Sequence, residues 1–255
     1  MGHYRTSIAG ESGKFQPTRW TQIVALSTQD TEKHQKLLGE LLSQYWKPIY
    51  CYIRRKGNPS QTAEDLTQSF IEDVILGREL ISQADKNKGR FRTFVLTSLE
   101  RYLHDVHQKD NAVKRSPKGQ RIPIDISEIS DSLLDQHGQS PEELFNYSLA
   151  SEILTQVLSE IEMLYLNEDK EIYWHIFEEK VINPLLEGCE SASNTEICSK
   201  YNIKDETTVS NMIVTVKRRF KTTMRNCLRE LVLSDSEVDE ELDEIFRILS
   251  QGHAK

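Results

Sequence analysis

Apolar residues recur at intervals of three and four along most of this chain, and this spacing constrains the fold more than any other feature. The pattern is clear in residues 32–57, where Pro48 can kink the helix and Gly57 is its expected end. Only 11 Gly and 7 Pro occur among the 255 residues, too few for the many turns of a β-sandwich or barrel. The sequence therefore predicts an all-α fold with long helices.

The segment after Gly57 carries signals for a helix start. Asn58 can act as the N-cap and Pro59 suits the first helical position, so we expect a helix over about residues 59–76. At 100° per residue its apolar side chains form one face, and its polar ones gather opposite: Asp65, Gln68, Ser69 and Glu72. Taken alone, such a polar face is most often simply solvated.

Charge is distributed in blocks. Residues 86–121 hold ten Lys or Arg and three Asp or Glu, a net charge of +7, whereas residues 122–169 hold eleven acidic residues and no Lys or Arg. Residues 200–229 are basic again, with a net charge of +6, although the whole chain carries −8. The two basic blocks coincide with helical periodicity, and the part of the acidic block without periodicity indicates a tether between two helical domains.

The second basic block contains a helix-turn-helix pattern. Ser193 and Glu196 form a capping box, and a second capped helix is expected to start near Asp205. In such a motif the start of the second helix reads base edges, while basic residues farther along meet the DNA backbone. The candidates are Thr207, Thr208, Ser210, Asn211, Lys217, Arg218, Arg219 and Lys221. The alternative is a basic amphipathic helix in an ordinary bundle.

Several segments together resemble bacterial sigma factors of the extracytoplasmic-function (ECF) class, in the branch common in planctomycete-like bacteria. The segment TAEDLTQSFIEDVI resembles the polymerase-binding helix, and KGRFRTFVLTSLERYLHDVHQ the promoter-melting helix. Farther on, VSNMIVTVKRRFKTTMRNCLREL resembles the reader of the minus-thirty-five element, and SEVDEELDEIF the C-terminal helix. The resemblance spans about residues 17–249. It departs from the family at His104, His107 and Gln108, where relatives often carry Arg, and by one extra residue in the turn before the reading helix.

The resemblance implies two helical domains. Residues 17–110 would form a domain like sigma region 2, and residues 141–250 a domain like sigma region 4. Residues 111–140 would be a flexible acidic linker that runs through basic channels of the polymerase, and residues 1–16 a flexible N-terminus.

The resemblance also implies roles for individual residues. The polymerase-binding residues would be Asp65, Leu66, Gln68, Ser69 and Glu72. Contacts to the minus-ten element would come from Lys88, Arg90, Arg92, Arg101 and Lys109, whereas the helical stripe places Phe91 in the core. The implied partners are core RNA polymerase (its β′ clamp and β flap), promoter DNA, and an anti-sigma factor or other protein inhibitor.

No catalytic residue, metal ligand or cofactor is expected. The four cysteines, Cys51, Cys189, Cys198 and Cys227, show no regular spacing, and no apolar run reaches the length of a membrane span, so we expect a cytoplasmic protein without membrane contact. Two alternatives stay open. One is a helix-turn-helix regulator that binds DNA without polymerase; the other is an HD-type metal-dependent phosphohydrolase built on His104 and Asp105.

Overall fold

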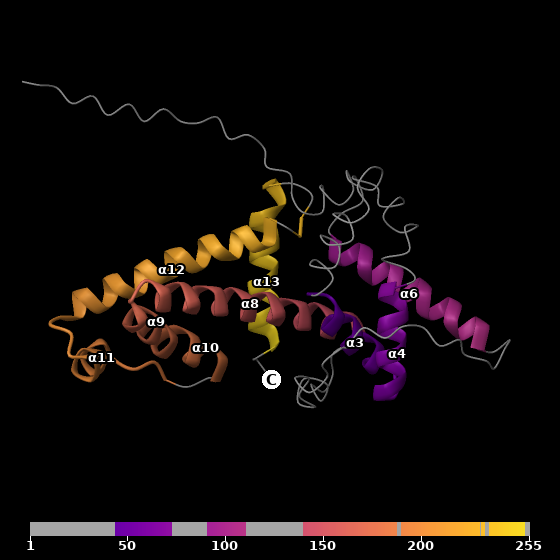
Figure 1. Cartoon of the computed structure of the whole chain (residues 1–255), viewed down its shortest axis with the longest axis horizontal. Coiled ribbons are helices and arrows are strands. Elements are labelled where there is room, and N and C mark those ends of the chain that lie inside the picture. The colour runs from indigo at the N-terminus through magenta and orange to yellow at the C-terminus, as the bar shows by residue number, and fades with distance from the viewer. Residues whose placement is uncertain are drawn as a thin grey trace, which may run out of the picture.

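The computed structural model describes residues 44–72, 91–110, 140–187, 190–229, 231–232 and 235–252 (Figure 1). The elements are, in chain order, α3 (Trp46–Arg55), α4 (Ser60–Ser69), α6 (Phe91–Asp110), α8 (Pro141–Asn167), α9 (Glu171–Phe177), the π-helical turn η2 (Glu178–Ile182), α10 (Asn183–Glu187), α11 (Asn194–Tyr201), α12 (Glu206–Arg229), the 3-10 turn η3 (Asp235–Glu237) and α13 (Val238–Gly252). Within these ranges no strand occurs, and the all-α prediction is confirmed for them.

The junction between α3 and α4 corrects two local predictions. Pro48 lies in the first turn of α3, where its missing N–H costs no helical hydrogen bond, so it does not kink the helix. Asn58 does not cap α4: its side-chain amide donates to the carbonyl oxygen of Ile53, 3.0 Å away, and so satisfies the end of α3. Gly57 has a φ of 94°, which confirms it as the stop of that helix.

The helix α8 is the longest described element and runs through the middle of the molecule (Figure 1). Its start is defined by a capping box, in which Ser140 Oγ accepts from the N–H of Glu143 at 3.1 Å and the Glu143 carboxylate accepts from the N–H of Ser140 at 2.7 Å. One part of α8 packs against α3, and other contacts join it to α9, α12 and α13. The helix therefore connects the early and late parts of the chain.

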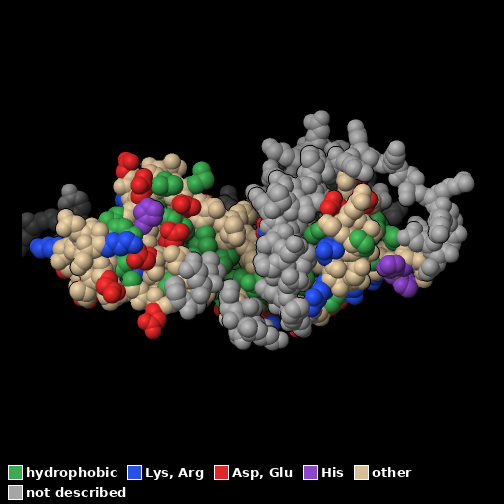
Figure 2. Space-filling model, turned by 90° about the horizontal axis from the view of Figure 1, so that it is seen from below, with side chains coloured by type: hydrophobic (Ala, Val, Ile, Leu, Met, Phe, Trp, Pro, Cys, Tyr) green, Lys and Arg blue, Asp and Glu red, His purple; other side chains and the backbone are tan. Residues whose placement is uncertain are grey.

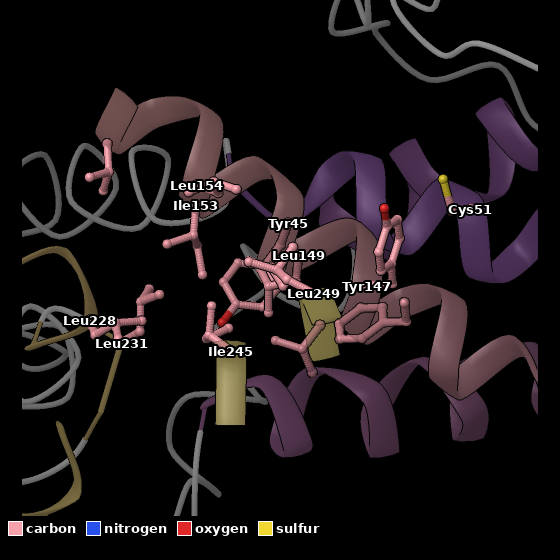
Figure 3. Packing of buried hydrophobic residues seen from close by; sticks show 14 of the residues in the cluster. Tyr45, Cys51, Tyr147, Leu149, Ile153, Leu154, Leu228, Leu231, Ile245 and Leu249 are labelled. Atoms are coloured by element: carbon pink, nitrogen blue, oxygen red, sulfur yellow. The ribbon is translucent and has the colours of Figure 1, made fainter. Parts of the chain in front are cut away.

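One large hydrophobic cluster draws on α3, α4, α6, α8, α9, α12 and α13. Figure 3 shows Ile245 and Leu249 of α13 beside Tyr45, which immediately precedes α3, and Leu149 of α8. The described residues from both sides of the expected linker thus share a core. The division into domains 17–110 and 141–250 stays a prediction, and residues 111–139 lie outside the described ranges.

Candidate functional site

The helix-turn-helix segment has a small core of its own. Ile176 of α9, Ile197 of α11 and Val209 of α12 are fully buried against one another and are surrounded by half-buried apolar side chains. Burial of these three apolar side chains favours the packing of α11 against α9 and the start of α12. The rest of α12 is held by the large cluster through Val216, Met224 and Leu228.

Local hydrogen bonds define the turn between the two helices. The predicted capping box is confirmed, since Ser193 Oγ accepts from the N–H of Glu196 and the Glu196 carboxylate accepts from the N–H of Ser193. Asn202 takes the left-handed conformation (φ 53°, ψ 45°) that ends α11. Asp205 Oδ1 then accepts from the N–H of Thr208 at 2.8 Å, which confirms the predicted start of the second helix.

Two side-chain contacts join α11 to the start of α12. Thr195 Oγ1 donates to Glu206 Oε1 at 2.8 Å, and the side-chain amide of Asn194 donates to Ser210 Oγ at 3.3 Å. These contacts hold the first turn of α12 in place. The Ser210 hydroxyl, one of the predicted base-reading groups, thus already accepts a hydrogen bond from Asn194.

The predicted DNA-reading residues lie along the outer side of α12. Thr208 is half-buried beside its cap, and the others are exposed: Thr207, Ser210, Asn211, Lys217, Arg218, Arg219 and Lys221. On a helix, positions separated by three, four or seven residues share a face, so Thr207, Asn211 and Arg218 form one stripe. The structure thus brings short polar groups and a guanidinium onto one accessible surface.

Val214 belongs to the same stripe and was missed from the sequence. Its side chain is 52% exposed, and it lies three residues after Asn211 and four before Arg218. Helical periodicity could have predicted its exposure, since Val209 and Val216 are buried and Val214 lies on a different side of the helix from both. An exposed aliphatic group among polar ones suits contact with a thymine methyl group.

Some cations of α12 have acidic partners on the protein. Arg219 lies 3.3 Å from the carboxylate of Glu168, at the end of α8, and Arg225 lies 2.9 Å from Asp239 of α13. These are solvent-exposed pairs, which are weak and screened by salt. They leave both guanidinium groups able to exchange a carboxylate for a phosphate.

Charge differs between the two sides of this end of the molecule. Figure 2 shows several acidic side chains, with a few Lys or Arg between them, at the end formed by α9, α10 and α11, on the side that faces away from α12. The exposed stripe of α12 carries Arg218 and Lys221 instead. A polyanion approaching this end is therefore attracted to the α12 side.

An ion pair ties α11 to the helix before it. The Glu179 carboxylate of η2 accepts from Lys200 Nζ at 2.7 Å and from the Tyr201 hydroxyl at 3.0 Å, both on α11. The hydrogen bond from Lys200 lowers the pKa of Glu179 below its usual value, and the hydrogen bond from the Ser193 N–H does the same for the pKa of Glu196. The helix-turn-helix is thus held partly by ionised carboxylates.

The predicted polymerase-binding residues lie on α4 and in the helical turn that follows it. Asp65 is exposed, whereas Leu66 is half-buried and packs against the large cluster. Gln68, Ser69 and Glu72 are half-buried, and Gln68 Nε2 donates to Glu72 Oε1 at 3.2 Å. The polar face of the sequence pattern thus exists as a surface, with Asp65 its most accessible member.

Of the residues predicted for the minus-ten element, the structure describes the side chains of Arg92 and Arg101. Arg101 is exposed on α6, but Arg92 is nearly buried and pairs with Glu241 of α13. Lys88, Arg90 and the side chain of Lys109 lie outside the described residues. Phe91 is 1% exposed, which confirms its predicted place in the core, and its ring centroid lies 6.2 Å from that of the half-buried Phe94.

In the described ranges, no group of three or more His, Cys, Asp or Glu side chains could hold a metal ion. His104 Nε2 lies 2.8 Å from Gln108 Nε2. None of the described helices combines the length and the apolar character that a membrane span requires. Comparison of the chain with protein-family models, with curated proteins and with solved structures finds no match.

Proposed function

We propose that this protein is a sigma factor of the ECF type, which binds core RNA polymerase and directs it to promoters. The observation that carries the proposal is the α11–turn–α12 unit, which has its own small core and an exposed stripe of polar and basic side chains. The second helix of such a unit enters the major groove, where its first turns read bases and its later cations bind phosphates. Thr207 and Asn211 would take the first role, and Arg218 and Lys221 the second.

The surface around Asp65 on α4 supports the polymerase part of the proposal. An exposed carboxylate next to the Gln68–Glu72 pair presents an acidic and polar face, which suits a basic partner surface. In a sigma factor this partner is the β′ clamp, while the helix-turn-helix unit would meet the β flap. The acidic tether would then run between the two docking points, and a protein inhibitor would act by masking them.

The net charge of −8 also has a place in this proposal. A module with few phosphate contacts, on an acidic chain, binds DNA weakly by itself, because counterion release provides most of the affinity. Polymerase would supply the missing affinity by holding both modules at the promoter. A regulator that acts alone has to bind its DNA tightly without help.

The deciding experiment mixes the purified full-length chain with core RNA polymerase and follows complex formation by size-exclusion chromatography. The complex is then tested for transcription from a library of genomic fragments, with core polymerase alone as the control. Co-elution together with new promoter-specific transcripts is the expected result. Tight sequence-specific binding to duplex DNA without a polymerase complex would contradict the proposal and favour the stand-alone regulator.

A further inference from the structure

Arg92 joins three helices through its guanidinium group. Its Nε lies 2.9 Å from Glu241 Oε1, and Nη2 lies 3.7 Å from Glu244 Oε1, both on α13. Its Nη1 donates to Asn146 Oδ1 of α8 at 2.9 Å. The side chains of Arg92 and Glu241 are only 11% and 5% exposed, so this ion pair is largely removed from water.

The same face of α13 is also packed against apolar side chains. Val238, Leu242, Ile245 and Leu249 are buried in the large cluster, and Figure 3 shows Ile245 and Leu249 next to Tyr45. α13 packs mainly against α8 and α12, and it reaches the early part of the chain through Tyr45 and through the ion pairs with Arg92. Docking of α13 therefore places Glu241 and Glu244 against Arg92, at the start of α6.

A buried ion pair contributes little net stability, because desolvation of the two charges offsets most of their attraction. Removal of only one of the two partners lowers stability strongly, since the remaining charge then lacks its partner in the interior. A guanidinium in this position can exchange carboxylates for phosphates, which it binds with the same planar donor geometry. The ion pair thus favours one docked position of α13, and Arg92 is suited to exchange the carboxylate of Glu241 for a phosphate.

We propose that α13 is a strap that closes the free protein, in which Glu241 and Glu244 occupy Arg92 in place of DNA phosphates. In the closed form the predicted minus-ten contact is unavailable, and α13 has to leave α6 before Arg92 can meet DNA. The proposal rests on the proposed function where it names DNA, but the docking and release of α13 can be measured without DNA or polymerase. The resulting device would keep the free chain from binding nucleic acid through its melting helix.

The test compares two variants of the full-length chain that remove one negative charge from α13. Glu241→Gln removes the buried partner of Arg92, and Asp243→Asn removes an exposed carboxylate two residues away. Because the two variants have the same net charge, a general charge effect on DNA binding cancels between them. Circular dichroism first establishes that both retain the helical content of the wild type.

The first readout is amide hydrogen exchange of the α13 peptide, with the α11–α12 peptides as the internal reference. We expect α13 of Glu241→Gln to exchange about tenfold faster than α13 of Asp243→Asn, because Arg92 then loses its buried charged partner and keeps only the 3.7 Å contact with Glu244 to hold α13. Equal exchange rates of the α13 peptide in the two variants would overturn the proposal that α13 is a strap. If Glu241→Gln does not fold, Glu244→Gln removes the half-exposed partner and should give a smaller increase of the same sign.

The second readout is affinity for a fluorescein-labelled single-stranded 30-mer of mixed sequence. If the closed form leaves about a tenth of the molecules competent, release tightens the apparent affinity about tenfold. The gain should disappear in the double variant Glu241→Gln with Arg92→Ala. Two results would overturn the gating role of α13: a gain in affinity that survives Arg92→Ala, or faster exchange of α13 without any gain in affinity. Failure of the sigma-factor proposal would appear separately, as absence of a complex with polymerase.

Discussion

The ring of Phe145, on α8, stands at 89° to the ring of Tyr52, on α3, with the two centroids 6.5 Å apart. The Phe145 centroid also lies 6.4 Å from that of Tyr45, which precedes α3. Phe145 belongs to the expected second domain, and both tyrosines to the expected first. In this structure the long helix α8 therefore contributes to the core that holds the early helices.

Phe145→Ala should lower the free energy of unfolding by about 3–5 kcal/mol, because it leaves a cavity among fully buried rings. Since the core is shared, urea unfolding followed by far-UV circular dichroism and by tryptophan fluorescence should give coincident transitions. Thr155→Ala, at an exposed site on the same helix, is the control and should change stability little. Two separate transitions in the wild type would contradict a shared core.

The combined change Asp65→Lys and Gln68→Ala should abolish binding to core polymerase while the helical content stays the same. Asp65 is exposed and Gln68 half-buried on the polar side of α4, so neither substitution opens the core. Glu160→Lys on α8 makes the same charge reversal at another exposed site and should leave binding intact. Co-elution with polymerase is the measurement, and normal co-elution of the α4 variant would reject the assigned surface.

Arg218→Ala should weaken binding to all duplex sequences and lower the salt slope of binding by about 1, because one phosphate contact is lost. Asn211→Ala should instead change the preference at particular base pairs. Both effects can be measured by fluorescence anisotropy of the polymerase complex on promoter variants, with Lys56→Ala, exposed near the end of α3, as the charge control. Equal weakening on every sequence by both variants would contradict the division of roles along α12.

Val214→Ala should abolish discrimination between thymine and uracil at one position of the bound site. The exposed valine can contact a thymine methyl, and burial of one methyl group is worth about 0.8 kcal/mol, or about a fourfold change in affinity. The measurement substitutes deoxyuridine for thymidine one position at a time in the selected promoter. If no position distinguishes the two bases in the wild type, Val214 does not contact a thymine.

Acid should destabilise the helix-turn-helix unit through Glu179. Its pKa is lowered from 4.5, chiefly by the hydrogen bond from Lys200, so its carboxylate stabilises the folded state above pH 4.5. This contribution is lost as the pH falls through the lowered pKa. The unfolding free energy of the wild type should therefore fall more between pH 7 and pH 3.5 than that of Glu179→Gln, by a small amount because the pair is near the surface. Equal falls would show that the Glu179 pair contributes nothing.

Much of the helix-turn-helix unit could be predicted from the sequence because its determinants are local. The capping box between Ser193 and Glu196, the helix start at Asp205 and the inward position of Val209 each depend on residues within one or two turns. Local hydrogen bonds and helical periodicity suffice to specify such features. For the same reason the burial of Phe91, at the start of α6, could be predicted from the helical spacing of the apolar residues alone.

The place of Arg92 was decided by the tertiary structure. In the sequence it is one of several cations in a basic block, and the family resemblance makes it a phosphate contact. In the fold its guanidinium pairs with Glu241, 149 residues later, and with Asn146 of α8. Asn58 presents the same ambiguity at short range, because its amide could serve either α3 or α4 and the fold directs it to α3. Periodicity specifies which face of a helix is buried, but the partner that a polar side chain meets depends on how the helices pack, and this is determined by burial across the whole chain.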